Sequence, residues 1–256
     1  MTEPVQADDI RWWNRLAEKL NGYQGTYRVS YEGATGEAEF VSLVNSKLNQ
    51  QSTVLDIGCA DGVFASRIAP LAGKVTAVDL SPVMIEKARS LQNEQLEFLV
   101  ADGRQLPFPE NAFDIVVSRR GPVSEPGFWE EAVRVVKPGG FLVEITIGNR
   151  DAVEWKELFG RGQGYAKRNT SRYMDIVTQI EAHPGVRLRE AHEYIADAVY
   201  PELEDVTLQL SSTPIVDDFD LVRDREVVRQ LAETCRIGQG IRRTYHRIVW
   251  AAQKQS

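Results

Sequence analysis

Apolar residues change their spacing repeatedly along the middle of the chain, and this pattern predicts alternating strands and helices. Short apolar runs, such as the one that holds Val54, Leu55 and Ile57, are typical of buried strands, and most are followed by apolar residues at helical spacing. Such repeated units form a parallel sheet covered by helices on both faces, so we expect an α/β fold with its ligand at the carboxyl ends of the strands. The predicted strands are 54–57, 74–79, 95–100, 112–117 and 140–147, and the predicted helices between them are 62–71, 82–92 and 126–136.

The segments on either side of this core have a less regular pattern. They contain no internal repeat and no low-complexity linker, which favours a single domain over residues 1–256. Helices are predicted at 8–20, 36–48, 151–160, 170–182 and 219–235, strands at 186–198 and 241–252, and irregular segments at 160–169 and 200–215.

The stretch 54–62, Val-Leu-Asp-Ile-Gly-Cys-Ala-Asp-Gly, predicts a strand, a tight turn and the start of a helix. Gly58 and Gly62 lack a Cβ, so a small ligand could approach the backbone there. The dinucleotide fingerprint Gly-x-Gly-x-x-Gly is incomplete, because Ala60 replaces its second glycine and the third comes one residue early. Asp79 ends the next strand, where such folds place the carboxylate that binds a ribose diol. The turn therefore indicates a nucleoside without a pyrophosphate.

Five segments resemble the successive motifs of class I S-adenosylmethionine-dependent methyltransferases, in that family's order and at its spacing. The resemblance covers residues 53–147 and is nearest to the group that contains the quinone- and biotin-pathway methyltransferases, with a distant similarity to a 23S rRNA guanine methyltransferase. The segments are 56–62, 77–81, 101–108, 113–118 and 136–141.

This resemblance implies that the cofactor is S-adenosyl-L-methionine and the product S-adenosyl-L-homocysteine. Asp79 would accept hydrogen bonds from both ribose hydroxyls, Leu80 would pack on the adenine, and Asp102 would accept from the adenine amino group. A turn or capping role is the competing explanation for Asp56 and Asp79. The residues assigned to the cofactor are Asp56, Gly58, Ala60, Gly62, Asp79, Leu80, Asp102, Gly103 and Ser118.

The family fold is Rossmann-like, with a mostly parallel seven-stranded sheet, helices on both faces and an antiparallel last strand. Its N-terminal segment covers the donor and the acceptor, and aromatic residues such as Trp13 and Tyr31 suit a sulfonium cation and a flat substrate. These aromatic residues could instead only pack their own segment. The resemblance divides the domain into a helical cover at 1–50, a donor-binding core at 51–148 and a substrate-side half at 149–256 with a lid insertion at about 200–240.

Arg119 and Arg120 follow the fourth predicted strand, at the corner that in this family lies beside the transferred methyl. They could hold an anionic acceptor by bidentate contacts, or they could form surface ion pairs with Glu125, Glu130 or Glu131. The corner lacks an Asn/Asp-Pro-Pro-Tyr motif, which disfavours a DNA base or an amide nitrogen as the target. Since methyl transfer depends mainly on alignment of the reactants, the sequence assigns no catalytic residue.

Composition limits the remaining possibilities. The formal net charge of −7 argues against a surface committed to nucleic acid, although Arg161, Lys167, Arg168 and Arg172 form a local basic patch that is either a solvated loop or an RNA contact. Two cysteines, Cys59 and Cys235, make no disulfide framework and fit a reducing cytoplasm. His183, His192 and His246 have no metal spacing, and no apolar run reaches the length of a membrane span.

The sequence therefore predicts a cytoplasmic monomer or homodimer that methylates a small-molecule or natural-product acceptor and uses no metal. A ribosomal or transfer RNA methyltransferase is the alternative, and a catalytically silent donor-binding subunit is a third hypothesis. The methylated atom stays open.

Overall fold

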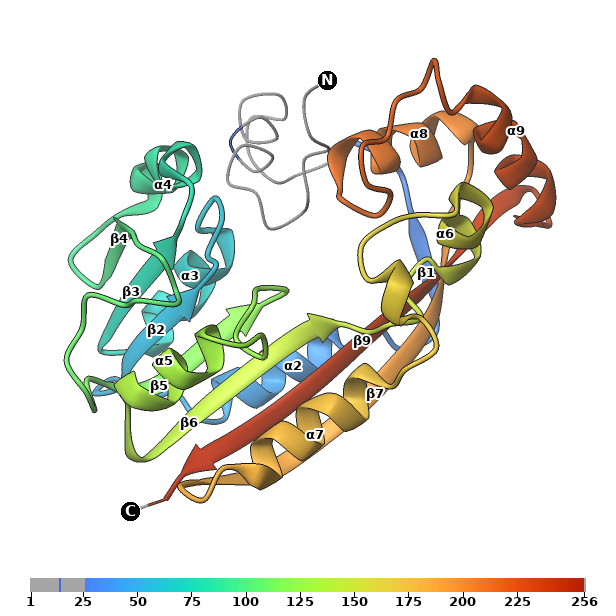
Figure 1. The fold of residues 1–256 in the computed structure, drawn as a ribbon. Helices are drawn as coiled ribbons and strands as arrows, with labels where there is room; N and C mark the ends of the chain where they lie inside the picture. Colours follow the sequence, from blue (N-terminus) through green and yellow to red (C-terminus); the bar gives the residue numbers. More distant parts are fainter. Residues whose placement is uncertain (1–13, 15–25, 256) are drawn as a thin grey trace. The chain divides into compact units, whose positions relative to one another are not determined.

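The computed structural model describes residue 14 and residues 26–255, which form two compact units (Figure 1). The larger unit comprises Gly36–Ile147, Arg172–Glu193 and the chain from Ile248 onward. The smaller unit comprises the described residues up to Thr35 together with Gly148–Ser171 and Tyr194–Arg247. The predicted helix at 8–20, apart from Asn14, and the predicted substrate residue Trp13 lie outside the described residues. That residues 1–256 form a single domain stays a prediction.

Parallel strands form the centre of the larger unit, as the apolar pattern predicts. They pair in the order β6-β5-β2-β3-β4, so the direction of winding reverses between β2 and β5. Ligands of open α/β sheets bind at this kind of switch point. The strands are β2 (Thr53–Ile57), β3 (Lys74–Asp79), β4 (Leu96–Val100), β5 (Phe113–Arg119) and β6 (Val136–Ile147), and the helices that follow β2, β3 and β5 are α3 (Val63–Ile68), α4 (Pro82–Ala88) and α5 (Phe128–Val135).

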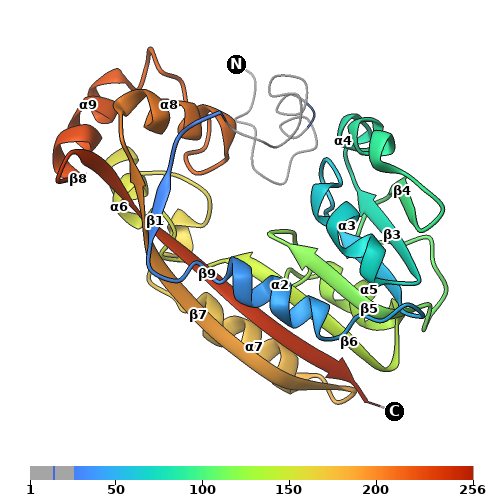
Figure 2. The same ribbon diagram turned by 180° about the vertical axis from the view of Figure 1, so that it is seen from behind.

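Helices cover both faces of this sheet. In Figure 1, α5 and α7 (Arg172–Ala182) lie in front of it, and in Figure 2, seen from behind, α2 (Glu37–Asn45) and α3 lie in front. Buried side chains join α5 and α7 to the sheet, among them Trp129 and Ile176. On the other face the rings of Phe40 and Phe64 lie 5.3 Å apart between α2 and α3. The predicted α/β architecture is confirmed.

Several predicted helices are shorter than the apolar pattern suggests; the helix predicted at 219–235, for example, comprises only Arg225–Thr234, and two others end in 3₁₀ turns. Helix α3 ends at Ile68 and continues as a 3₁₀ turn, Ala69–Leu71, because Pro70 has no N–H to donate to an α-helical hydrogen bond. Helix α4 likewise ends at Ala88 and continues as the 3₁₀ turn Arg89–Leu91. Both α-helices begin near the predicted residue.

Over residues 26–255, the smaller unit contains helices and the ends of two long strands. Its helices are α6 (Val153–Phe159), α8 (Leu203–Ser212) and α9 (Arg225–Thr234), and a 3₁₀ turn covers Tyr165–Lys167. The long strands β7 (Val186–Tyr200) and β9 (Gly240–Lys254) run from one unit into the other, and Figure 1 shows β9 running opposite to β6. Trp155, Tyr200 and Leu231 are fully buried in the core of this unit.

The sequence interpretation was wrong at two places in the smaller unit. Residues 200–215, predicted to be irregular, contain helix α8, whose buried Val206 and Leu210 are four residues apart on one face. Over the described residues the sheet has nine strands instead of seven. The additional strands, β1 (Ser30–Glu32) and β8 (Arg236–Ile237), are too short to give an apolar period, and each pairs antiparallel with a long strand. The lid role of 200–240 stays a prediction.

Candidate functional site

A left-handed turn follows β2 at the switch point of the larger unit. Gly58 and Gly62 have φ of 79° and 77°, a backbone region that glycine adopts without strain. The Gly58 N–H donates to the Val78 carbonyl at 2.9 Å, which ties the turn to β3. A Cβ at Gly62 would lie 2.5 Å from Cε1 of Phe98, so glycine is required there by packing as well as by conformation.

Ala60, the residue that replaces the second fingerprint glycine, also lies in the left-handed region, with φ of 48°. This conformation costs a residue with a Cβ about 1 kcal/mol. The Ala60 N–H donates to Oδ2 of Asp79 at 2.9 Å and so offsets part of that cost. The turn thus keeps the left-handed backbone conformation that glycine favours, although residue 60 is alanine.

Asp79 ends β3 and holds two loops with its carboxylate. Besides Ala60, it accepts the N–H of Ser81 at 2.9 Å, and Ser81 caps helix α4 through its hydroxyl. Burial raises the pKa of Asp79, and the two N–H donors oppose that rise. Asp79 therefore has the turn role that the sequence left open. A carboxylate offers about four acceptor positions, so two remain for a ligand.

Asp56 is the most unusual group of the site. Its side chain is 1% exposed, and neither carboxylate oxygen has a hydrogen-bond partner among the described residues. Burial and the charge of Asp79 raise the pKa of Asp56 to about 7, while Arg119 acts in the opposite direction. A buried polar group without a partner is costly, so Asp56 favours a ligand that can donate to it.

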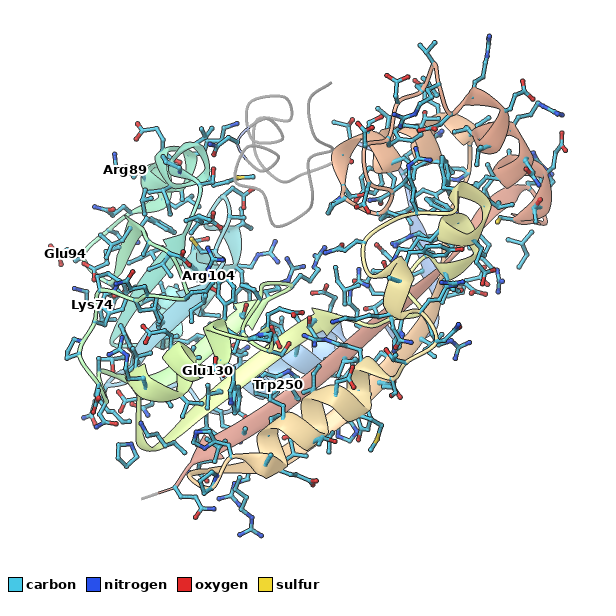
Figure 3. All side chains as sticks on the ribbon, in the orientation of Figure 1. Lys74, Arg89, Glu94, Arg104, Glu130 and Trp250 are labelled. Atoms are coloured by element: carbon cyan, nitrogen blue, oxygen red, sulfur yellow. The ribbon has the colours of Figure 1, made fainter. Side chains whose placement is uncertain are left out.

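The loops after β3 and β4 hold the residues predicted to bind the adenine. Leu80 is 37% exposed, so its side chain is accessible to the adenine ring that the sequence predicts there. Asp102 is paired with Arg104 (labelled in Figure 3) at 2.8 Å, and this contact holds the pKa of Asp102 below its usual range. A Cβ at Gly103 would lie 2.8 Å from the Phe128 ring, so this glycine has a packing role of its own. Their contacts with a cofactor stay predictions.

Ser118, predicted as a cofactor residue, points into the protein. It is fully buried, and its hydroxyl donates to the Ile57 carbonyl at 2.8 Å, which joins the ends of β5 and β2. A Cβ at Gly121 would overlap this hydroxyl and would lie 2.7 Å from the Ile57 oxygen. Sequence reasoning missed Gly121, although a glycine directly before a proline at the end of a strand is a turn signal.

Arg119 and Arg120 form ion pairs, but with a partner that the sequence did not suggest. Nε of Arg119 lies 2.9 Å from Oε2 of Glu37, and Nε of Arg120 lies 3.3 Å from Oε1 of the same residue. The three acids that the sequence offered as partners have other contacts: Glu125 pairs with Arg172, Glu130 accepts from Gly127, and Glu131 pairs with Arg134.

The backbone at this corner is strained. Arg120 has φ of 62°, and its N–H donates to the Ile145 carbonyl at 2.7 Å. Non-glycine residues in this region occur preferentially at functional sites.

A second buried carboxylate supports the loop that follows this corner: Glu144 accepts from the indole of Trp250 (labelled in Figure 3) at 2.8 Å and from the Ser124 N–H at 3.4 Å. Burial raises the pKa of Glu144 to about 7.

A family model described as a methyltransferase domain matches residues 54–140, the segment that carries this turn and the strands around it. The chain contains a class I S-adenosylmethionine-dependent methyltransferase domain. The resemblance read from the five sequence motifs is thereby confirmed.

Known proteins similar to this chain include two curated relatives and a solved structure. A ubiquinone/menaquinone biosynthesis C-methyltransferase of Coxiella burnetii is 29% identical over 163 residues, 56% of this chain and 65% of the relative. A sterol 24-C-methyltransferase of Pneumocystis carinii is 30% identical over 217 residues, 80% of this chain and 54% of the relative. This chain thus spans less than two thirds of either relative. The YcgJ protein of Bacillus subtilis shares the fold, with a TM-score of 0.64 at 18% identity over 86% of this chain and 100% of that one.

Other residues singled out in the sequence have contacts of their own. Tyr31 belongs to the smaller unit, on β1, where its ring meets Tyr245 edge to face at 4.9 Å. The local basic patch is partly neutralised, because Arg161 pairs with Asp224 and Arg172 with Glu125, each at 2.7 Å.

The histidines and cysteines show no sign of a metal site. His246 is fully buried and its Nδ1 accepts the N–H of Arg150. Both cysteines are free and buried, and burial raises the pKa of each thiol. Among the described residues, no cluster of His, Cys, Asp and Glu is suited to a metal ion.

Proposed function

We propose that this methyltransferase domain binds S-adenosyl-L-methionine at the turn after β2 and transfers its methyl group to a small-molecule acceptor. The observation that carries the proposal is Asp56, a carboxylate that is buried beside a strained turn and has no hydrogen-bond partner in the part of the chain that the structure describes. The methionine part of the cofactor carries an ammonium group, which is the kind of donor that Asp56 lacks. The residues present therefore fit the cofactor.

The chain's own residues would bind and orient the cofactor. Asp56 would pair with the ammonium, the backbone from Gly58 to Gly62 would approach the methionine part, and Asp79 would accept from the ribose hydroxyls with the positions that its two N–H contacts leave. When bound, the cofactor supplies an electrophilic methyl group. What remains for the protein is to align the reactants and exclude water, so we assign no general base.

A small acceptor is favoured over RNA by three observations. One of the two curated relatives is named a C-methyltransferase of ubiquinone and menaquinone biosynthesis, and the other is named a sterol 24-C-methyltransferase. The net charge is −7, and two of the four residues in the local basic patch are ion-paired with acids.

None of the helices in the described part of the chain is both long and apolar enough to cross a bilayer. We propose a cytoplasmic location, with the oligomeric state open between a monomer and a homodimer.

Calorimetric titration of the full chain with S-adenosylmethionine and S-adenosylhomocysteine tests the cofactor site. We expect both to bind, and Asp79→Ala to weaken binding by roughly tenfold or more, as expected for a charge-assisted hydrogen-bonded contact. Glu94→Gln is the control, because Glu94 is an exposed acid of the same unit (Figure 3). Failure of the wild type to bind either molecule would overturn the proposal.

A further inference from the structure

We propose that a groove between α2 and α3 binds the anionic head of an amphipathic molecule, a carboxylate or phosphate on an apolar body, and that this is the acceptor class of the methyltransferase. The inference rests on the proposed function for its link to methyl transfer. The groove itself is a feature of the larger unit and can be tested separately.

The groove has a volume of about 570 Å³ and is lined by one side of α2, by Phe64 and Arg67 of α3, and by Arg119. Figure 2 shows α2 and α3 on the same face of the sheet. Cavities of 300–1,000 Å³ are typical of small-molecule sites. The groove is therefore large enough for an acceptor of ordinary metabolite size.

Positive charge predominates at the Arg119 end of the groove. Arg119 and Arg120 converge on the single carboxylate of Glu37, and Arg119 also acts electrostatically on Asp56. Arg67 is exposed and has no ion-pair partner among the residues that the structure describes. The lining of the groove thus holds two guanidinium groups, those of Arg67 and Arg119, and one carboxylate, that of Glu37. Guanidinium groups match the geometry of carboxylates and phosphates, so this end favours an anion.

Glu37 has the chemistry of a ligand that can be exchanged. It lies in the first turn of α2, where its side chain is 24% exposed, and it presents one carboxylate oxygen to each arginine. An incoming carboxylate or phosphate offers the same acceptor atoms and could take over one of these contacts. The strained backbone of Arg120 keeps the second guanidinium directed at this point.

The rest of the groove combines apolar and polar side chains. Val41, which is 37% exposed, lies beside Ala38 and Phe64, and the two remaining lining residues, Ser42 and Asn45, are polar. An apolar body would cover the apolar side chains while its charged end contacts the arginines. The pattern of one charged end and apolar walls distinguishes an amphipathic anion from a nucleic-acid phosphate, which has no apolar body to offer.

The test uses octanoate and octyl phosphate as probes and octanol as the neutral control, titrated into the full chain by calorimetry. We expect both anions to bind at least tenfold more tightly than octanol, which shares their apolar body. The ratio of the two anion affinities distinguishes a carboxylate acceptor from a phosphate acceptor. Equal binding of octanol and the two anions would overturn the proposal.

Two variants sharpen this test. Arg67→Gln should weaken anion binding by about tenfold, whereas Glu37→Gln should strengthen it several-fold, because the competing carboxylate is lost and the shape is kept. Arg89→Gln and Glu86→Gln are matched controls, since these residues form an exposed ion pair at 2.8 Å elsewhere in the larger unit (Arg89 is labelled in Figure 3). Weaker anion binding by Glu37→Gln would show that Glu37 is structural and would overturn the exchange.

Titration of Arg67→Gln with S-adenosylmethionine separates the two proposals. This variant should bind the cofactor within about twofold of the wild type, because Arg67 is exposed and lies outside the proposed cofactor contacts. Anion binding without cofactor binding would overturn the proposed function and leave the groove intact as a site. Cofactor binding without anion binding would overturn the groove alone.

Discussion

Two buried aspartates, one in each unit, have opposite electrostatic environments. Asp56 in the larger unit has no hydrogen-bond partner among the described residues, and its pKa is raised to about 7. Asp151 in the smaller unit lies 3.0 Å from Nη1 of Arg243 and 2.6 Å from Nη1 of Arg247, and these charges hold its pKa far below the usual range. Burial is nearly the same for both, at 1% and 3% exposure, so the partners make the difference.

We interpret the difference as one between a structural charge, Asp151, and a charge that serves the proposed cofactor site, Asp56. Removing one partner of a buried ion pair leaves an uncompensated charge, so the Asp151 cluster is a fixed part of the core. Asp56 carries its desolvation cost without compensation from the described residues, which is the pattern of a site that sacrifices stability for binding. The following predictions test this contrast.

The largest effect is expected in the smaller unit. Asp151→Ala should lower the free energy of unfolding by about 3–5 kcal/mol, because Arg243 and Arg247 would remain buried without their counter-ion. Urea denaturation followed by circular dichroism measures this loss. Asp218→Ala, which removes an exposed partner of Arg223, should change stability by less than about 1 kcal/mol. Similar small losses for both variants would contradict the structural role of Asp151.

Asp56→Asn should have the opposite sign in the cofactor-free protein. The pKa of Asp56 is about 7 in the folded chain and 3.8 without perturbation, so the folded state holds the proton more tightly. The contribution of the Asp56 carboxyl to the free energy of unfolding of the wild type is therefore highest below about pH 4. It falls as the pH rises towards 7 and is constant above that pH. At pH 8 the variant should be more stable than the wild type, on the order of 1–2 kcal/mol, after allowance for the buried amide.

Denaturation series from pH 4 to pH 8 measure this difference directly. The advantage of Asp56→Asn should grow through that range, while its binding of S-adenosylmethionine should be weakened at every pH. An advantage that is independent of pH would show that Asp56 is already ionised in the empty site.

Cofactor binding should release a proton from Asp56. An ammonium beside the carboxylate lowers its pKa, so at pH 7 the wild type should release roughly half a proton for each cofactor bound. Calorimetry in two buffers with different ionisation enthalpies counts the protons. The count should fall in Asp56→Asn, whereas an unchanged count would assign the proton to another group.

The smallest effect is expected at the turn. Ala60→Gly should relieve the left-handed strain, but glycine also gains freedom in the unfolded chain, so we expect a net stabilisation of only about 0.5 kcal/mol. Ala38→Gly on α2 is the matched control and should destabilise the protein by about 1 kcal/mol. If Ala60→Gly were as destabilising as the control, the turn would not be strained.

The sequence predicted well those parts of the fold that depend on the local spacing of apolar residues and on the turn or capping residues beside them. The core strands and the helices after β2, β3 and β5 begin near the expected residues because their apolar runs are bounded by glycine, proline or a capping serine. The fold class of the family followed from five motifs in order. Helix α8 was missed because Pro201 and the run from Ser211 to Pro214 have strong turn signals that outweighed its short apolar face.

The sequence predicted which residues belong to the candidate site, but it predicted few of the contacts that these residues make. Asp56 was assigned from its place in the first motif and Asp79 from its place at the end of the next strand. Their contacts depend on how the strands pair: Asp56 has no hydrogen-bond partner among the described residues, whereas Asp79 accepts from two loops. The contact of Arg119 with Glu37 joins residues 82 positions apart, which no local spacing can show. The same holds for Gly121, whose lack of a Cβ matters because Ser118 comes back to the same point.

The packing of Phe98 against Gly62 constrains how this sequence can change over time. A Cβ at Gly62 would meet both Phe98 and Ala88, so no side chain can enter at 62 until the aromatic ring has been replaced by a smaller one. Replacement of Phe98 alone would leave a cavity, which also costs stability. The two positions are therefore epistatic. Because the φ of 77° at residue 62 also strains any other residue, we expect glycine to predominate at 62 in a library that randomises both, and the exceptions to occur together with a smaller residue at 98.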